Sequence, residues 1–197
     1  RDRLWRLYGR PADAGDLCPR AARDGLMCVE DEAGTWDELA RYDRPLSLPL
    51  VTVERFSADA LVLGIEGQSA WLLGESGPVQ VQLAELAQLW NGRFRYLWQL
   101  PEGFSSPLSV GDSGIAVAEV ARLFARLDGQ DTPLAGERFN SALELRVRLF
   151  QRQYGLVDDG VVGARTLVRL NELLGIDPGA AAAREYFFTA ASAGERP

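Results

Sequence analysis

One stretch of the sequence decides the C-terminal fold: FQRQYGLVDDGVVGARTL, residues 150–167. Gly155 follows a run with helical spacing, which predicts a helix that ends in a left-handed turn, since glycine adopts that conformation at low cost. Asp159-Gly160 predicts a tight turn, and Gly163 predicts a close approach to the helix that begins after it. The stretch is therefore expected to form a helix, a short loop and a second helix.

The surrounding sequence places this stretch in a small helical domain. The segment Pro101–Pro107 is rich in turn-forming residues and predicts a domain boundary. Beyond it, apolar residues recur every three or four positions in three segments, residues 115–127, 140–154 and 164–174. We expect a three-helix domain over residues 104–176, followed by a tail over residues 177–197 that returns as a helix or as an extended arm.

The N-terminal half shows a different pattern. Short helical segments are expected first, at residues 4–8, 17–24 and 36–42. Alternating and β-branched segments then predict strands at residues 46–53, 60–65, 68–73, 79–83 and 94–100, with a short helix or turn at 84–90. Pro49 is expected near an edge or a bulge. Helices followed by a meander of strands favour an α+β architecture for residues 1–103.

The overall charge argues against two classes of partner. The 197 residues carry a formal net charge of −7. Nucleic-acid binders need a surplus of Lys and Arg to displace counterions from phosphates, and an anionic membrane surface attracts the same residues. We therefore expect neither as a partner. The sequence has no recognisable signal peptide or membrane-spanning run and begins at Arg1 without Met, so we expect a piece of a longer protein.

The sequence contains no histidine. Histidine is the commonest general base, the commonest zinc ligand and the usual partner of a Ser or Cys nucleophile. We therefore expect no metal, no cofactor and no catalytic residue. Paired carboxylates would be another route to hydrolysis, but Asp31-Glu32 and Asp158-Asp159 are chain neighbours that do not face each other across a substrate. Solvated charge is the expected role of both pairs.

Cys18 and Cys28 are the only cysteines of the chain. An even pair in a short chain is consistent with one disulfide in an oxidising compartment. The chain is expected to reverse at Gly25, and the separation of 28 − 18 = 10 residues lets the two Cα atoms approach within about 7 Å. Two thiols without histidine make a poor zinc site. We expect a disulfide, and two buried free cysteines are the alternative.

The C-terminal motif resembles the peptidoglycan-binding domain attached to many bacterial cell-wall enzymes. The matching residues are Gly111-Asp112-Ser113-Gly114, Val117, Phe150-Gln151, Gly155-Leu156, Asp159–Gly163 and Thr166-Leu167, whereas Ala121 stands where the family often has Gln. A groove for a glycan–peptide polymer needs polar groups above an apolar floor. We expect peptidoglycan contacts among Gln151, Arg152, Tyr154, Asp158, Asp159, Val161, Val162, Arg165 and Thr166. The competing interpretation is that these residues are scaffold and solvated surface.

The N-terminal half resembles the papain-like peptidases that trim bacteriocin leaders, through its helices, its strand meander and Arg44-Pro45-Leu46-Ser47-Leu48. The resemblance places the histidine of that family near Asp59-Ala60, its Asp or Asn near Gly74, and its nucleophile upstream of Arg1. Because the chain has no histidine, and because neither cysteine matches the nucleophile, the resemblance implies a degenerate peptidase domain.

The two halves together are similar to the periplasmic region of general secretion pathway protein A, a family that assembles the outer-membrane secretin of type II secretion. The resemblance rests on Trp5 with Gly9, Cys18 with Ala22, Gly25-Leu26 and Cys28, Trp36 with Leu39, Arg44-Pro45, Trp90 with Gly92, and Leu97-Trp98. That family adds a cytoplasmic ATPase and one membrane span. The resemblance implies a periplasmic region tethered to the inner membrane, with peptidoglycan, an inner-membrane B subunit and, through them, the secretin as partners.

Three functions compete on the sequence alone. The leading prediction is a non-catalytic region that anchors or remodels the wall contact of a type II secretion assembly factor and helps secretin assembly. The first alternative is a cell-wall hydrolase or residual peptidase with a wall-targeting domain. The second is a structural interaction protein without wall affinity. A second copy of the chain is a further candidate partner.

Overall fold

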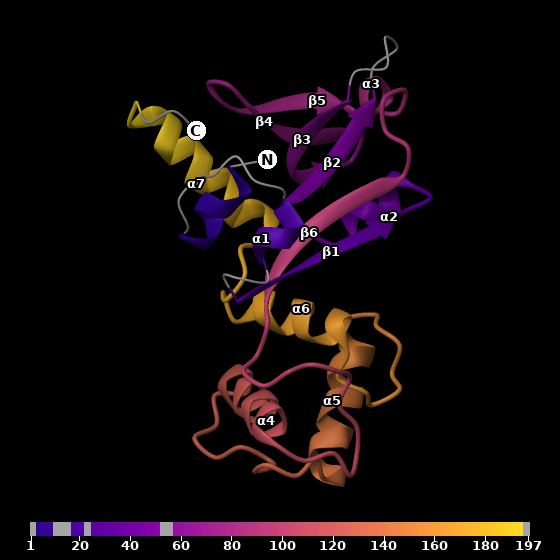
Figure 1. The fold of residues 1–197 in the computed structure, drawn as a ribbon, viewed down its shortest axis with the longest axis vertical. Helices are drawn as coiled ribbons and strands as arrows, with labels where there is room; N and C mark the ends of the chain where they lie inside the picture. The colour runs from indigo at the N-terminus through magenta and orange to yellow at the C-terminus, as the bar shows by residue number, and fades with distance from the viewer. Residues whose placement is uncertain (1–2, 10–16, 22–24, 52–56, 195–197) are drawn as a thin grey trace. The chain divides into compact units, whose positions relative to one another are not determined.

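The chain forms two compact units in a computed structural model that describes residues 3–9, 17–21, 25–51 and 57–194 (Figure 1). The sheet unit comprises residues 1–97 and 178–197, and the helical unit comprises residues 98–177. In chain order the helical unit is therefore an insertion within the sheet unit. This division differs from the expected separate tail over residues 177–197, because the C-terminal helix packs on the sheet.

The sheet unit contains a six-stranded sheet with the strand order β1-β6-β2-β3-β4-β5 within the described residues. Its strands are β1 (Leu26–Glu32), β2 (Leu46–Val51), β3 (Ser57–Glu66), β4 (Ser69–Gly74), β5 (Gly77–Gln82) and β6 (Arg93–Gln99). The short helices are the 3-10 helix η1 (Leu4–Tyr8), α1 (Leu17–Ala21), α2 (Trp36–Ala40) and α3 (Leu83–Leu86). The expected α+β class is confirmed, with β2–β3, β3–β4 and β4–β5 antiparallel.

Two details of the sheet differ from expectation. The strand β1 was not predicted, because its second half is the acidic run Glu30-Asp31-Glu32, and acidic residues are uncommon in strands. Pro49 does not lie on an edge strand, since β2 has neighbours on both sides. The pairing of β2 with β6 is limited to Ser47 opposite Arg95, and Pro49 lies beyond that pair, where a missing N–H costs least.

The C-terminal helix α7 (Ala180–Ser192) completes the core of the sheet unit. Ala183 and Phe187 of this helix are fully buried and pack with Leu63 of β3. Gly64 makes the close approach possible, since a Cβ atom there would lie 2.9 Å from the Cβ of Ala180. Gly64 also has a φ of +144°, a backbone conformation that residues with a side chain rarely adopt.

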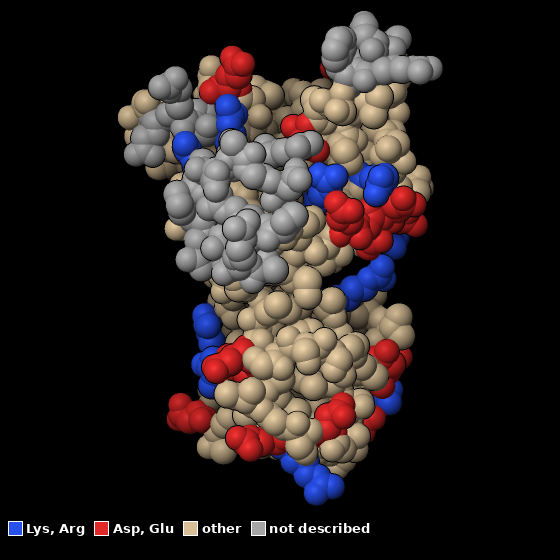
Figure 2. Space-filling model, viewed as in Figure 1, with Lys and Arg blue, Asp and Glu red and all other residues tan. Residues whose placement is uncertain are grey.

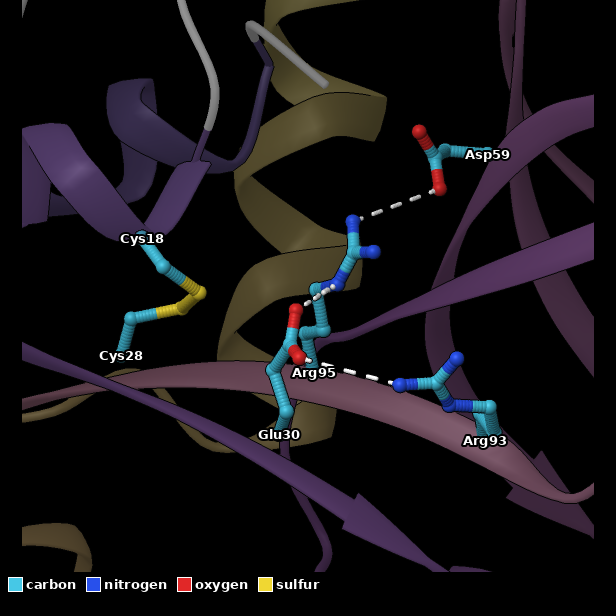
Figure 3. Close-up of a disulfide and its surroundings, with 6 residues drawn as sticks. All are labelled: Cys18, Cys28, Glu30, Asp59, Arg93 and Arg95. Atoms are coloured by element: carbon cyan, nitrogen blue, oxygen red, sulfur yellow. Dashed lines mark ion pairs between the residues drawn. A yellow bond between two sulfur atoms is a disulfide. The ribbon is translucent and has the colours of Figure 1, made fainter.

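The expected disulfide between Cys18 and Cys28 is present (Figure 3). It joins α1 to β1, with the two Cα atoms 4.9 Å apart. Beside it, a buried cluster packs the N-terminal helices against the sheet through Leu4, Trp5, Leu17, Ala21, Leu26 and Leu97. The disulfide therefore reinforces a contact that apolar burial already favours.

The helical unit contains the three expected helices, α4 (Ile115–Leu127), α5 (Ser141–Gln153) and α6 (Ala164–Leu173). Asn140 caps α5, since its side chain accepts a hydrogen bond from the backbone N–H of Leu143. Phe124 and Phe150 meet edge to face in the core, with ring centroids 5.4 Å apart. None of the helices among the described residues is long and apolar enough to cross a membrane.

One polar cluster joins the two ends of the helical unit. The side-chain amide of Asn171 donates hydrogen bonds to the carbonyl oxygen of Gln99 at 2.8 Å and to the carboxylate of Asp177 at 3.1 Å. The backbone N–H of Gln99 in turn donates to Asp177 at 3.0 Å. Residues that enter and leave the unit are thereby held side by side.

Candidate functional site

The motif at residues 150–167 is organised by the side chain of Gln151. This residue is 2% exposed, although the sequence analysis placed it among the ligand contacts. Its amide nitrogen donates to the carbonyl oxygen of Val161 at 2.9 Å, to Asp159 at 3.1 Å and to Thr166 at 3.3 Å. Its amide oxygen accepts a hydrogen bond from the backbone N–H of Gly160 at 2.9 Å. Gln151 therefore holds the loop to both flanking helices.

The loop between α5 and α6 adopts the expected tight turn at Gly160, which has a φ of +76°. A Cβ atom there would lie 2.9 Å from the side chain of Glu144 and 3.0 Å from that of Arg148. Gly163 behaves differently from expectation: its φ is −99°, and a Cβ atom would meet nothing within 4 Å. The expected close approach at Gly163 is therefore wrong, and its role is that of the residue before α6.

An ion pair forms the outer rim of this loop. The guanidinium of Arg152 lies 2.6 Å from the carboxylate of Asp158, and both side chains are exposed. The guanidinium of Arg148 also donates a hydrogen bond to the carbonyl oxygen of Asp158. The hydrogen bond from Arg152 is the main cause that lowers the pKa of Asp158 below its ordinary value.

An aromatic and cationic cluster lies at the end of α5. The ring of Tyr154 packs against Phe150, with centroids 4.8 Å apart, and the guanidinium of Arg169 lies 4.8 Å from the centroid of the Tyr154 ring. Tyr154 itself is half-buried. The sequence analysis did not find Arg169, because its contact with Tyr154 joins two helices and leaves no spacing signal.

The structure separates the candidate residues into accessible and buried ones. The exposed candidates are Arg152, Asp158, Asp159 and Arg165, and the half-buried ones are Tyr154 and Val161. The buried ones are Gln151, Val162 and Thr166, at 2%, 0% and 3% exposure. Val162 exchanges two backbone hydrogen bonds with Leu108, which fixes the loop from its other side. The side chains of these three residues are therefore not on the accessible surface of the unit.

A second group of charges lies on the sheet unit, at the position where the peptidase resemblance places a histidine. Asp59 of β3 lies 3.8 Å from the guanidinium of Arg95 on β6, and Arg95 lies 2.6 Å from Glu30 on β1 (Figure 3). Arg93 approaches Glu30 at 3.9 Å and Glu32 at 3.8 Å. The charges thus alternate in sign from β1 to β6 to β3, and the opposite charges compensate one another.

The described part of the chain does not indicate a metal centre. No group of three or more Cys, Asp or Glu side chains there is arranged to hold a metal ion. On the face shown in Figure 2, the positive and negative side chains of the described residues are interspersed.

The comparison with protein families gives one match in the helical unit. Residues 113–170 match the family described as “Putative peptidoglycan binding domain”. The matched segment contains α4, α5, the loop organised by Gln151 and most of α6.

The comparison with whole proteins covers both units. “General secretion pathway protein A” of Aeromonas hydrophila is 28% identical over 174 residues, which cover 87% of this chain and 31% of that protein. “Putative general secretion pathway protein A” of Escherichia coli K12 is 28% identical over 179 residues, or 85% of this chain and 34% of that protein. The chain thus spans about a third of the length of these curated relatives.

Among solved structures, a periplasmic domain of the EpsAB fusion protein of the Vibrio vulnificus type II secretion system is similar. It superimposes with a TM-score of 0.60 at 27% identity, over 87% of this chain and 76% of that one. The resemblance expected from the sequence is therefore confirmed. Along most of its length the chain is similar to general secretion pathway protein A, and its helical unit carries the segment that matches the peptidoglycan-binding family.

Proposed function

We propose that this chain is a non-catalytic periplasmic region that binds peptidoglycan through its helical unit. The observation that carries the proposal is the family match over residues 113–170, which contains the loop held by Gln151. The similarity to general secretion pathway protein A and to a periplasmic domain of EpsAB supports a role within type II secretion.

The proposed contact surface is the exposed rim of the α5–α6 loop. Tyr154 offers an apolar ring face, and the exposed Arg152, Asp159 and Arg165 offer groups that can hydrogen-bond to the sugar or peptide part of the wall polymer. Gln151 acts through the loop, because its hydrogen bonds fix the backbone from which this rim projects. Binding sites of this kind depend on such preorganisation.

The sheet unit is proposed to be a degenerate peptidase domain without a catalyst. The position expected for a histidine holds Asp59, whose carboxylate faces Arg95 rather than a thiol. The position expected for the third catalytic residue is Gly74, the last residue of β4, which offers no side chain. A carboxylate at this position does not supply the imidazole that activates a cysteine nucleophile.

The proposed partners beyond the wall follow from the relatives. A factor of this kind would contact an inner-membrane B subunit and, through the wall and that subunit, help to assemble the secretin. The tether to the inner membrane would lie outside this chain, which spans about a third of the length of its curated relatives. These partners are secondary in the proposal. The family match of the helical unit supports wall binding directly, whereas the other partners follow only from the relatives.

The decisive experiment is co-sedimentation of the full 197-residue chain with purified peptidoglycan sacculi. We expect the chain to pellet with sacculi and the Arg165→Gln variant to pellet less, since Arg165 lies on the proposed surface. Arg122→Gln is the matched control, because Arg122 is an exposed arginine of α4 in the same unit, paired with Glu119. A chain that stays in the supernatant at low salt contradicts wall binding. Release of peptide or sugar fragments would favour the hydrolase alternative.

A further inference from the structure

The five tryptophans of the chain differ in what covers them. Trp5 and Trp98 are buried, at 0% and 1% exposure. Trp71 is half-buried, but the guanidinium of Arg184 lies 5.8 Å from its ring centroid, and Phe188 packs edge-on against it. That leaves one half-buried pair, Trp36 and Trp90, whose ring centroids lie 4.2 Å apart with a tilt of 34°.

Regular structure and hydrogen bonds fix the positions of both tryptophans of this pair. Trp36 is the first residue of α2, whose start is capped by the hydroxyl of Thr35 accepting from the N–H of Glu38. Trp90 is held through its backbone by an isolated bridge to Leu50 of β2. Its indole N–H donates to the carbonyl oxygen of Arg93 at 2.7 Å. The indole donor of Trp90 is therefore already paired within the unit.

Several chain neighbours of the pair among the described residues are polar. Asp37, Gln88 and Asn91 are exposed chain neighbours of the two tryptophans. The nearest cation along the chain, Arg93, faces Glu30 and Glu32. Preformed aromatic surface beside amide and carboxylate side chains suits a neutral ligand with apolar faces and a hydroxylated rim, which is the chemistry of a sugar ring.

We propose that Trp36 and Trp90 form a second saccharide-binding site, on the sheet unit, for the glycan chain of peptidoglycan. The inference rests on the proposed function, because the family match of the helical unit is what brings a glycan polymer to this protein. The C–H faces of an N-acetylated sugar stack on the indoles, and its hydroxyl and acetamido groups reach Gln88 and Asn91. Aromatic surfaces also dock proline-rich peptides, so that class of ligand is an outcome of the test.

The test is an NMR titration of the full chain with chitohexaose, a neutral β-1,4-linked hexamer of N-acetylglucosamine. The indole N–H groups give one resonance for each tryptophan. We expect the resonances of Trp36 and Trp90 to shift, while that of the buried Trp5 does not. Trp36→Leu or Trp90→Leu, which keep an apolar side chain, should weaken binding about tenfold. Trp71→Leu is the matched control and should leave the affinity unchanged.

The outcomes separate this inference from the proposed function. If chitohexaose leaves Trp36 and Trp90 unshifted while the chain still pellets with sacculi, the second site is refuted and wall binding stands. If the chain neither pellets nor shifts, both ideas fail. Shifts of the two indoles with a proline-rich decapeptide but not with chitohexaose also overturn the saccharide site. Equal weakening by the Trp71 control would mean that the loss reflects general unfolding and would likewise refute it.

Discussion

The side-chain oxygen of Gln151 accepts a hydrogen bond from the backbone N–H of Gly160, nine residues further along the chain, at 2.9 Å. The amide nitrogen of the same side chain donates a hydrogen bond to the carbonyl oxygen of Val161 in the loop. A single buried amide thus replaces the regular backbone pairing that a loop lacks, and loop geometry depends on it. The family match over residues 113–170 therefore includes the residues that hold this loop.

Replacing Gln151 by Ala should destabilise the protein by about 2–4 kcal/mol, because buried polar groups lose their partners at about 1–3 kcal/mol each. Gln153→Ala is the matched control, since Gln153 is exposed on the same helix and its removal should cost less than about 0.5 kcal/mol. Urea unfolding measures both. Equal midpoints for the two variants would show that the loop does not depend on Gln151.

The pKa of Asp158 should rise toward its ordinary value in Arg152→Gln, because the hydrogen bond from Arg152 is the main cause of its depression. Arg148→Gln should raise it less, since Arg148 contributes the smallest of the lowering effects. A depressed folded-state pKa means that the pair stabilises the fold above the unfolded pKa, and that this is lost as the pH falls through the folded pKa. Carboxyl ¹³C titration by NMR measures the pKa of Asp158 in the unchanged protein, in Arg148→Gln and in Arg152→Gln. We expect the pKa to increase in that order, and a higher pKa in Arg148→Gln than in Arg152→Gln would contradict the assignment.

Gly64→Ala should loosen α7 from the sheet and cost about 2 kcal/mol or more, because it adds both a strained φ and a contact with Ala180. Gly67→Ala is a control for the strain alone, since its φ is also positive but its Cβ would meet nothing within 4 Å. Adding Ala180→Gly to Gly64→Ala should recover part of the loss. If thermal unfolding finds no such recovery, the close approach of α7 is not the cause.

Removing the disulfide by Cys18→Ser with Cys28→Ser should lower stability by about 2–3 kcal/mol on the chain-entropy estimate for a loop of this length. The loss should appear in urea unfolding under non-reducing conditions. Alkylation of denatured protein without reductant is the direct check on the bond. Two added alkyl groups on protein purified from an oxidising compartment would show that the cysteines are free.

The helical unit was more predictable from sequence than the sheet unit. The apolar spacing of residues 115–127 predicted the bounds of α4 as the structure has them. In an amphipathic helix, the spacing of the apolar residues within the helix itself indicates the buried face. The sequence of β1 has no comparable apolar pattern, since its second half is acidic and resembles the sequence of a loop. The sequence also did not predict where α7 packs, because its partner Leu63 lies more than a hundred residues away in the chain.

The candidate site was predictable in position but not in role. The sequence located the segment, yet it did not separate Gln151, which is buried, from Arg152, which is exposed. A closer reading of the spacing contains the distinction, because Gln151 lies four residues after the buried Val147 and therefore on the same helix face. The contact between Arg169 and Tyr154 has no comparable signal, since it depends on how α5 and α6 pack.

The clamp of Gln99, Asn171 and Asp177 has a mechanical consequence. Under the proposed wall binding, tension on the helical unit divides between two covalent connections instead of running through one linker, because the unit enters and leaves at neighbouring points. One connection continues into β6, an interior strand, and the other into α7, which is packed on β3. Such a pull would load β6 and α7 together, and both are packed within the sheet unit.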